Sequence, residues 1–496
     1  MATAAVTLAA PREAPKPGRV VVREVVLGMA VVGGGTTALF VFLPTSVALL
    51  VALPVACIWV WQAPVRGVYV LVAGAAMIEI FPLGFPDSLT DRVPLFLNLN
   101  NSVGFGVPIT PAEILMVVTA AAAVTRSSSE HSLQWPRGRL FNAYMAYLVV
   151  VLFAELHGLL GGGDFKTSLW EMRPQAYGFI LFVLTATLVE ERVQIERLAL
   201  VFLLATLAKG AIGSFRYFFT LHGQLGSGLE VLAHEDSYFL AMFMTVTLAA
   251  LLWIKNRRLV TLMSIGSLLC LIAMLANSRR AGVFAAAGAV AVVLLLAYKF
   301  EPPLRKRIAW VTLLVVVAGA AFVASAWDKE YGIQAQLVRP IRSLVDPSAR
   351  DFSSDLYRTA ETANLLFTYH TSPVVGVGFG RPFDIVYPMA DISSIYPLWN
   401  VIPHNSLLWI GMRMGTIGFI AFWGLIGLAV LTGFDVIRRR RDPFVRAVAA
   451  VILGAIAAEI AVGYTDLQLE NYRNMIFIGA ALGLLYALER REAEAP

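Results

Sequence analysis

Residues 403 to 418 read PHNSLLWIGMRMGTIG, and this stretch joins a long polar segment to an apolar run. The apolar run is long enough to cross a lipid bilayer as a helix. His404 and Asn405 therefore lie where we expect water to meet lipid. Polar side chains at such a boundary are costly and tend to mark function. We interpret this junction as a candidate site, and the rest of the chain as a scaffold that holds it on one side of a membrane.

The composition is that of a membrane protein. The 496 residues are 58% hydrophobic and 15% charged, with a mean hydropathy of +0.72. Soluble domains carry about 25% charged residues, whereas here apolar runs near the ~20-residue length of a membrane span recur from end to end. Cys57 and Cys270 both lie inside apolar runs, so we expect no disulfide. The sequence predicts an all-α, polytopic membrane protein with about 14 transmembrane helices.

The candidate spans leave one long loop between them. They lie near residues 25–43, 45–61, 66–82, 110–125, 140–160, 173–190, 196–214, 237–254, 259–276, 281–299, 308–326, 406–433, 445–463 and 474–488. The predicted organisation is a disordered cytoplasmic tail at 1–24, transmembrane helices 1 to 11 in 25–326, an extracytoplasmic loop subdomain with the catalytic residues at 327–405, transmembrane helices 12 to 14 in 406–488, and a cytoplasmic tail at 489–496.

Basic residues gather on one side of this arrangement. By the positive-inside rule that side faces the cytoplasm, so both chain ends are predicted to be cytoplasmic. The formal net charge of +6 is then an orientation signal and implies no nucleic-acid partner. The basic clusters are Arg12, Lys16, Arg19 and Arg23; Arg126, Arg137 and Arg139; Lys255, Arg257 and Arg258; Lys299, Arg305, Lys306 and Arg307; Arg438 to Arg441 with Arg446; and Arg490 with Arg491.

The long loop has enough residues to form a small subdomain. Ser353 or Ser354 can cap a helix that runs from Asp355 to about His370. Apolar residues recur along this stretch at a helical spacing, which predicts one face packed against the rest of the protein.

The GVGFG sequence at 376–380 has closely spaced glycines. It lacks the preceding strand and the following helix of a dinucleotide-binding site, so we interpret it as a flexible or sharply turned passage. The short cytoplasmic loops carry no Walker motif. We expect no nucleotide site there and no cofactor.

Five arginines lie at or near span ends on the predicted outer side. Outward basic residues are uncommon in membrane proteins, and the planar guanidinium binds phosphate oxygens bidentately while staying protonated. A cluster of them above the membrane suits the diphosphate of a lipid-linked substrate. The alternative for any single arginine is contact with lipid headgroups. The five are Arg173, Arg216, Arg279, Arg280 and Arg358.

Histidine and aspartate supply the remaining candidates. His404 can exchange a proton near neutral pH, although an interfacial hydrogen-bonding role is also open. Asp384 and Asp391 can hold an acceptor sugar, or they can simply be solvated loop residues. The other histidines in the outer loops show no zinc-binding spacing, so we expect no metal site.

Several short motifs together resemble the superfamily of O-antigen ligases and polymerases. The turn at 277–282, NSRRAG, is similar to the family's Ser-Arg-Gly turn. Arg358 followed by Pro373 and GVGFG resembles its spacing from Arg to Pro-x-x-Gly-x-Gly. PHNS at 403–406, with GTIG at 415–418, is similar to its His-Asn-Ser signature, and WEMRP at 170–174 to its outer arginine. The resemblance runs from about residue 110 to 480.

The resemblance implies a fold related to the integral-membrane GT-C glycosyltransferases. It implies an enzyme of the bacterial cytoplasmic membrane with an extracytoplasmic site. An undecaprenyl-diphosphate-linked glycan would be the donor and a glycan or lipid hydroxyl the acceptor, in an inverting, metal-independent transfer. Other polysaccharide-export proteins are further candidate partners. Twelve spans are usual among the ligases, so the first two predicted spans are candidates for an addition.

The resemblance also assigns roles to individual residues. His404 would be the general base. Arg279, Arg280 and Arg173 would hold the diphosphate, with Arg358 and Arg216 as further contacts, and Asn405, Asp384 and Asp391 would support the acceptor or the loop. Which of Arg279 and Arg280 corresponds to the family's arginine stays open.

Two other functions remain open from the sequence. Buried polar residues such as Glu79 and Glu459, with fourteen spans, are compatible with a transporter or flippase of lipid-linked glycans. A peptidoglycan-type glycosyltransferase would share the donor chemistry but use a second lipid-linked disaccharide as acceptor.

Overall fold

A computed structural model describes residues 17–81, 83, 88–103, 108–129, 135–223, 231–277, 279–329, 332–394 and 396–493. Residues 1–16 of the predicted tail and Ser278 of the NSRRAG turn lie outside this range. Within it the structure is helical throughout and contains no strand, which confirms the predicted all-α class.

The helices follow the apolar stretches closely. In chain order they are α1 (Pro17–Phe42), α2 (Thr45–Gln62), α3 (Val65–Met77), η1 (Thr90–Arg92), α4 (Leu99–Val103), α5 (Pro111–Ser129), α6 (Arg139–Leu160), α7 (Phe165–Leu188), α8 (Arg192–Phe215), η2 (Arg216–Thr220), α9 (Asp236–Trp253), α10 (Arg257–Ala276), α11 (Arg280–Phe300), η3 (Pro302–Leu304), α12 (Arg305–Ala326), α13 (Gly332–Val345), α14 (Ala349–Thr371), α15 (Ser406–Arg439), α16 (Pro443–Gly463) and α17 (Tyr472–Ala493).

Each of the fourteen predicted spans falls on one of these helices. Ten helices among the described residues are long and apolar enough to cross a membrane: α1, α2, α6, α8 with η2, α9, α10, α11, η3 with α12, α15 and α16. The chain is therefore a multi-span membrane protein. Crossing by α3, α5, α7 and α17 stays a prediction, and α3 has only 13 residues.

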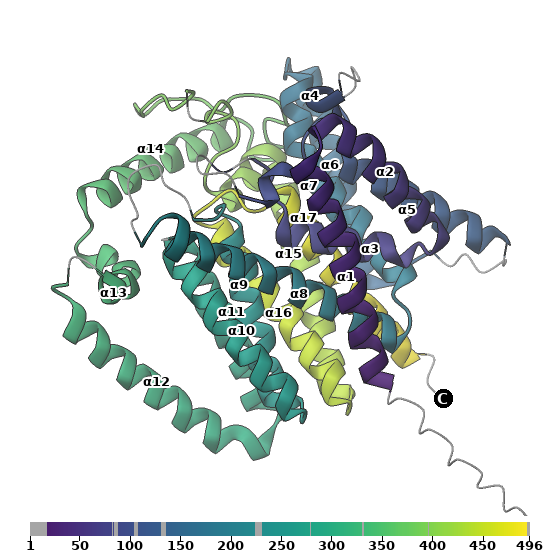
Figure 1. Cartoon of the computed structure of the whole chain (residues 1–496). Coiled ribbons are helices and arrows are strands. Elements are labelled where there is room, and N and C mark those ends of the chain that lie inside the picture. Colours follow the sequence, from purple (N-terminus) through teal and green to yellow (C-terminus); the bar gives the residue numbers. More distant parts are fainter. Residues whose placement is uncertain are drawn as a thin grey trace, which may run out of the picture.

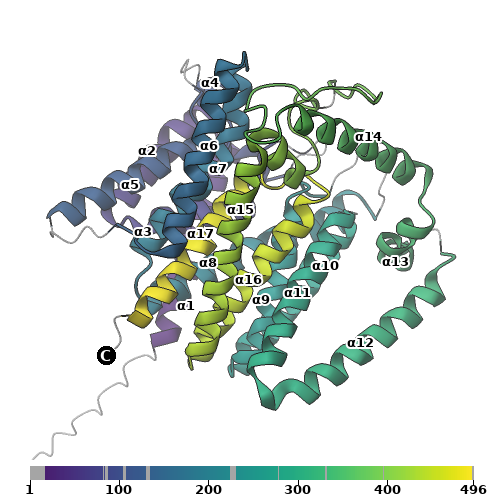
Figure 2. The same cartoon turned by 180° about the vertical axis from the view of Figure 1, so that it is seen from behind.

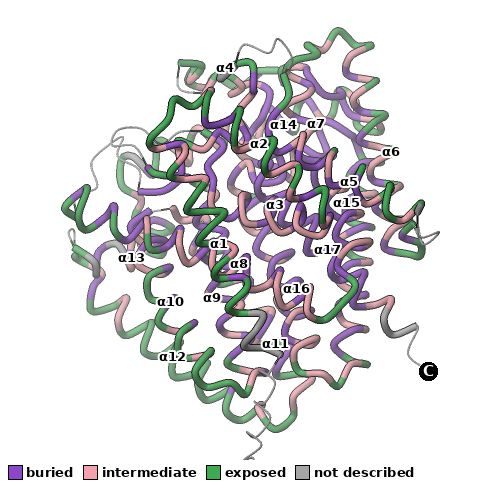
Figure 3. Tube along the Cα trace, turned by 45° about the vertical axis from the view of Figure 1, so that its right-hand side comes forward, coloured by how far each residue is buried: buried purple, intermediate pink, exposed green. Residues whose placement is uncertain are grey.

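The bundle is built around helices that are apolar on most sides. α17 packs along α7, and α16 packs along both α11 and α9 (Figures 1 and 2). Burial is highest where these helices meet and lowest along the outer helices (Figure 3). α12 is the least buried of these helices. It stands apart from the bundle (Figure 1), and 6% of the residues in its most apolar stretch are buried. In a membrane such a helix is solvated mainly by lipid.

The basic helix ends gather at one end of the bundle. Arg446 pairs with Glu301, Arg440 donates to the Leu488 carbonyl at 3.0 Å, and Arg192 pairs with Asp442 at 2.7 Å. α14 crosses the opposite end (Figures 1 and 2). This separation supports the predicted orientation, in which the basic end faces the cytoplasm.

Two predicted boundaries were wrong. The loop helix begins at Ala349, earlier than the predicted Asp355, because the Ser348 side chain rather than Ser353 or Ser354 accepts the capping hydrogen bond from the Asp351 amide. The helix at the predicted span 173–190 begins earlier, at Phe165, so the WEMRP sequence lies inside α7. Asp164 caps that helix by accepting from the Thr167 amide at 2.8 Å.

α15 is broken at Gly415, where the backbone has φ 63° and ψ −166°. The residues after Pro373 run across the break. The amides of Val377 and Gly378 donate to the carbonyls of Met412 and Arg413, at 2.9 and 3.0 Å. Beyond the break, the Thr416 amide donates to the Pro373 carbonyl at 2.9 Å. Backbone groups freed by the break are thus paired with the loop, as a low-dielectric setting requires.

The glycines of the GVGFG sequence allow its backbone to approach α6 closely. Gly376, Gly378 and Gly380 have φ of 74°, 79° and 78°. A Cβ on Gly378 would lie 2.3 Å from the Cα of Gly158 in α6. The predicted sharp passage is therefore confirmed, and it is held rigidly between α6 and α15.

Replacing Gly378 with alanine is expected to destabilise the protein. The left-handed backbone alone costs a residue with a Cβ about 1–2 kcal/mol, and the contact with Gly158 adds to it. The thermal unfolding midpoint in detergent, followed by tryptophan fluorescence, should fall. Gly424→Ala in α15 is the matched control, because its added Cβ meets no atom within 4 Å. Equal midpoints for the two variants would contradict the packing described.

Candidate functional site

A buried ion pair fastens the long loop to the bundle. Glu171 of α7 and Arg413 of α15 are both fully buried, with Arg413 Nε 2.6 Å from Glu171 Oε1. The other Glu171 oxygen accepts from the Gly380 amide at 2.6 Å. Arg413 also donates to the carbonyls of Gly378 and Val401, at 3.1 and 2.7 Å. The pair therefore holds both ends of the segment that leads into the His-Asn-Ser sequence.

Each residue of the His-Asn-Ser sequence has a different structural environment. Asn405 caps α15, since its side-chain oxygen accepts from the Leu408 amide at 3.0 Å. Ser406 is fully buried and bonds through Oγ to the Glu470 carboxyl and to the Asp466 carbonyl. His404 is partly exposed to solvent, with 24% of its side chain accessible.

His404 is oriented by a carboxylate on α14. Its Nδ1 lies 3.1 Å from Glu361 Oε1, and its backbone amide donates to Glu361 Oε2 at 3.0 Å. A carboxylate accepts, so Nδ1 carries a proton, and in the neutral form of the ring Nε2 keeps its lone pair. The ring of Tyr357 meets the imidazole edge to face, with centroids 5.7 Å apart. Glu361 is almost fully buried, so the ring is held in one orientation.

α14 also carries one of the predicted arginines and pairs with another. Arg280, at the start of α11, forms a two-pronged pair with Asp355, at 2.7 and 3.3 Å. Arg358 follows Asp355 by three residues and precedes Glu361 by three, so the three lie on neighbouring turns of one helix. Arg358 makes no ion pair or hydrogen bond with any residue that the structure describes. Of the five predicted arginines, the structure gathers Arg280 and Arg358 along α14.

The remaining three arginines have different surroundings. Arg173 pairs with Glu113 at 3.2 Å and donates to the Pro108 carbonyl. Arg216 lies in η2 at the end of α8 and is buried. Arg279 stands at the N-cap of α11, directly before Arg280. Whether these three meet a diphosphate stays a prediction.

The two loop aspartates differ in position. Asp391 is exposed and accepts from the Ser393 amide at 2.8 Å. Burial raises the pKa of Tyr357, and the charges of Glu361 and Asp391 raise it further. Asp384 lines a separate cavity further along α14.

No short motif in the sequence marks the carboxylates near His404. Glu361 is 43 residues from His404 in the chain, and Glu171 is 242 residues from Arg413. Burial raises the pKa of Tyr396, and the charges of Glu470, Glu171 and Glu361 raise it further. The helical face of α14 was the one available clue to Glu361.

A second buried ionic cluster lies apart from His404. Lys209 pairs with Glu79 and lies 3.4 Å from Asp236, which also pairs with Arg473. All four side chains are buried, and they tie α8, α9 and α17 to the end of α3. The sequence left the buried Glu79 compatible with a transporter. These ion pairs explain why a carboxylate is buried there.

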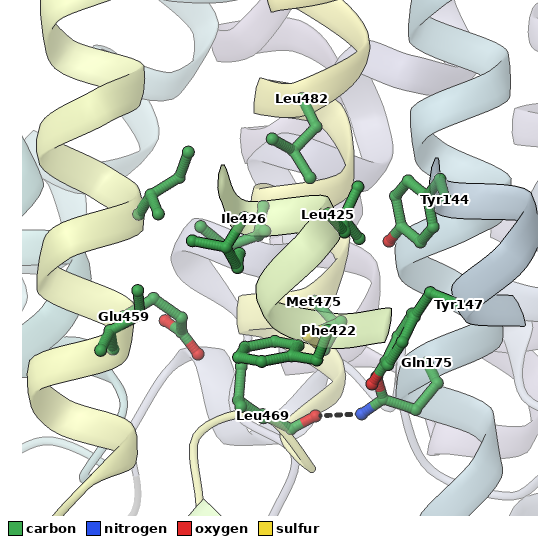
Figure 4. Close-up of a pocket in the computed structure, with 13 residues that line it drawn as sticks. Tyr144, Tyr147, Gln175, Phe422, Leu425, Ile426, Glu459, Leu469, Met475 and Leu482 are labelled. Atoms are coloured by element: carbon green, nitrogen blue, oxygen red, sulfur yellow. Dashed lines mark hydrogen bonds between the residues drawn. The ribbon is translucent and has the colours of Figure 1, made fainter. Parts of the chain in front are cut away.

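The cavity beside Glu459 is too small for a substrate. It measures about 30 Å³, the volume of one water molecule, and its walls include Tyr144, Tyr147 and Gln175 (Figure 4). Glu459 itself accepts from the Asn474 side-chain amide at 3.0 Å. This space is a packing gap at the centre of the bundle.

Residues 265–423 match the family model described as O-antigen ligase. The match confirms the resemblance over this part of the chain, which includes α11 to α14, His404 and the broken part of α15. The WEMRP sequence lies outside the matched residues. No curated protein matches the sequence. The family indicates a membrane enzyme that joins glycans, with a lipid-linked glycan as its substrate.

Glu470 predicts a pH dependence of stability. Burial raises the pKa of its carboxyl from the ordinary 4.5 to about 8, although the Ser406 hydrogen bond opposes the shift. The folded state thus holds this proton more tightly than the unfolded state. The stabilisation is fully present below pH 4.5 and is lost as the pH rises through 8.

Replacing Glu470 with glutamine should flatten this dependence. We expect the thermal midpoint of the wild type to fall more between pH 5 and pH 9 than that of Glu470→Gln. Asp328→Asn, an exposed aspartate, should follow the wild type. Parallel curves for wild type and Glu470→Gln would refute a carboxyl that is protonated in the fold.

Proposed function

We propose that the protein is a glycosyltransferase that transfers or polymerises a polyprenyl-diphosphate-linked oligosaccharide or polysaccharide onto an acceptor hydroxyl. The reaction would take place at the outer face of the bacterial cytoplasmic membrane. The observation that carries the proposal is the His404–Glu361 pair at the loop–helix junction, within the part of the chain that matches the O-antigen ligase family.

His404 would act as the general base. Its Nε2 takes the proton of the acceptor hydroxyl as that oxygen attacks the anomeric carbon of the donor. The bond from this carbon to the diphosphate oxygen breaks, and its electron pair leaves with the polyprenyl diphosphate. Attack opposite the leaving group inverts the anomeric configuration. Glu361 would stabilise the imidazolium that forms, because it accepts from Nδ1 at 3.1 Å.

Arg358 and Arg280 would offset the charge that builds on the departing diphosphate. Guanidinium groups suit this task because they donate bidentately and stay charged. Arg358 has no ion-pair or hydrogen-bond partner among the described residues, so its guanidinium can contact the diphosphate directly. Arg280 is already paired with Asp355, which orients it. Arg279 and Arg173 remain further candidates for the same diphosphate. The transfer as written uses protein side chains alone and is proposed to be metal-independent.

Replacing His404 should abolish transfer while the protein stays folded. In nanodiscs with undecaprenyl-diphosphate oligosaccharide and EDTA, His404→Ala should lower kcat about 10²–10⁴-fold. Glu361→Gln should cause a smaller loss and shift the pH–rate profile, because it perturbs the imidazole without removing it. His370→Ala is the control, since its ring bonds the carbonyl of Leu366 in its own helix. Products resolved by size would separate polymerase from ligase.

Wild-type turnover that survives His404→Ala would overturn this mechanism. Wild-type movement of a labelled lipid-linked glycan across liposomes, without transfer, would favour the flippase alternative. Loss of transfer in EDTA, restored by a divalent cation, would contradict the metal-independent reaction.

The Arg280–Asp355 pair offers a second test. If Arg280 only anchors α14, Arg280→Gln and Asp355→Asn should lower activity equally, because each breaks the same pair. If Arg280 stabilises the diphosphate, Arg280→Gln should reduce kcat about 10²-fold or more, and Asp355→Asn much less. Initial rates at saturating donor measure the difference, with the exposed Arg92→Gln as control.

A further inference from the structure

A polar cavity lies further along α14, away from His404. Its volume is about 260 Å³, and it is lined by the C-terminal end of α14, by His157 of α6 and by the loop after α14. The cavity is open to solvent, and Thr371 and Asp384 in its wall are exposed. Polar side chains account for most of its walls. They are His157, Thr368, Thr371, Ser372, Arg381 and Asp384.

The hydroxyl groups in this cavity are already committed. Thr368 Oγ1 donates to the Asn364 carbonyl at 2.9 Å and accepts from the Asp384 amide at 2.8 Å. Ser372 donates to the Gly376 carbonyl at 2.7 Å. These bonds fix the backbone of the cavity, so its shape is built in advance of any ligand.

Arg381 and Asp384 are the charged side chains in the same cavity, and their charged groups are not committed to hydrogen bonds of this kind within the described structure. Neither the guanidinium of Arg381 nor the carboxylate of Asp384 makes an ion pair or side-chain hydrogen bond with a residue that the structure describes. One is a fork of donors and the other accepts only. The cavity wall therefore offers hydrogen-bond donors from Arg381 and acceptors from Asp384, and the charges of these two side chains cancel.

A ligand that satisfies both side chains must accept hydrogen bonds from Arg381 and donate them to Asp384. An anion would satisfy Arg381 and be repelled by Asp384, and a cation would have the reverse difficulty. A neutral group rich in hydroxyls satisfies both, because each hydroxyl donates and accepts. The volume is below the roughly 300 Å³ at which ordinary small-molecule pockets begin, which suits one sugar ring and not a chain.

The cavity is displaced from the reacting position by a defined length. Thr368 follows Glu361 by seven residues, or two turns of α14, which corresponds to about 10 Å along the helix. Both side chains are buried on the same face. A sugar in the cavity would therefore not itself react at His404, but the spacing is short enough for a neighbouring residue of one glycan chain to do so.

We propose that this cavity is a subsite for one neutral pyranose residue of the glycan, at a distance from the bond that forms. The proposal rests on the proposed glycosyltransferase function. Arg381 and Asp384 form hydrogen bonds with hydroxyls of the sugar and so determine which repeat unit is accepted. The same chemistry serves a residue of the donor chain or of the acceptor chain.

Binding can be measured without turnover. Full-length protein in nanodiscs would be titrated with neutral methyl glycosides of common hexoses, one at a time, by saturation-transfer NMR. We expect at least one to give a signal that weakens about tenfold or more in Arg381→Gln and in Asp384→Asn. The signal should persist in His404→Ala and in the exposed controls Arg92→Gln and Asp328→Asn. Thermal midpoints would establish that every variant is folded.

Kinetics assign the sugar to a chain. With lipid-linked donor and acceptor varied separately, Arg381→Gln and Asp384→Asn should raise one KM about tenfold with little change in kcat. A raised donor KM places the sugar in the donor chain, and a raised acceptor KM places it in the acceptor chain. A fall in kcat with both KM values unchanged would overturn the subsite.

The binding experiment has its own refuting outcomes. No signal from any methyl glycoside in the wild type, or equal signals in wild type and both cavity variants, would overturn the proposal. Displacement by inorganic phosphate that depends on Arg381 would show an anion site instead. Specific sugar binding in a protein that transfers nothing would leave the subsite standing and reject the glycosyltransferase.

Discussion

The ion pair between Glu171 and Arg413 is the interaction on which the outer half of the protein depends. Both side chains are fully buried, and removing ions of this kind from water costs several kcal/mol each. The cost is offset because their remaining polar atoms are also bonded, to Trp409, to Gly380 and to the carbonyls of Gly378 and Val401. Loss of either partner would leave a buried charge uncompensated, which typically costs about 3–5 kcal/mol.

The break in α15 is the second constraint, and it depends on the first. Gly415 interrupts the helix where the segment after Pro373 crosses it, and the two backbones complete each other's hydrogen bonds. A broken helix next to lipid is tolerated only when its freed backbone groups find partners in the protein. The glycines of the loop are needed because no Cβ fits between Gly378 and α6. The GVGFG sequence thus forms a joint between α6 and α15.

α14 connects this rigid joint to the proposed chemistry. One stretch of this helix presents Asp355 to Arg280 and Glu361 to His404, and it carries Arg358 between them in the chain. Further along, Thr368 forms a wall of the polar cavity. His404, two of the predicted arginines and the polar cavity are therefore all connected to this one helix. Such an arrangement can align an extended glycan with the reacting position without a large moving part.

The sequence by itself determined the membrane class, the position of nearly every helix and the placement of His404 at a helix start. These follow from local features, because apolar runs of ~20 residues and capping side chains act within a few residues of each other. The start of α14 was misjudged because three serines, Ser348, Ser353 and Ser354, are each chemically able to cap.

Tertiary structure alone decided which residues meet. Glu361 with His404, Glu171 with Arg413, and the division of the five arginines between α14 and other places all join segments far apart in the chain. Burial, which gives such pairs their strength, is created only when the helices pack. A carboxylate in a helix looks the same in sequence whether it faces water or a histidine.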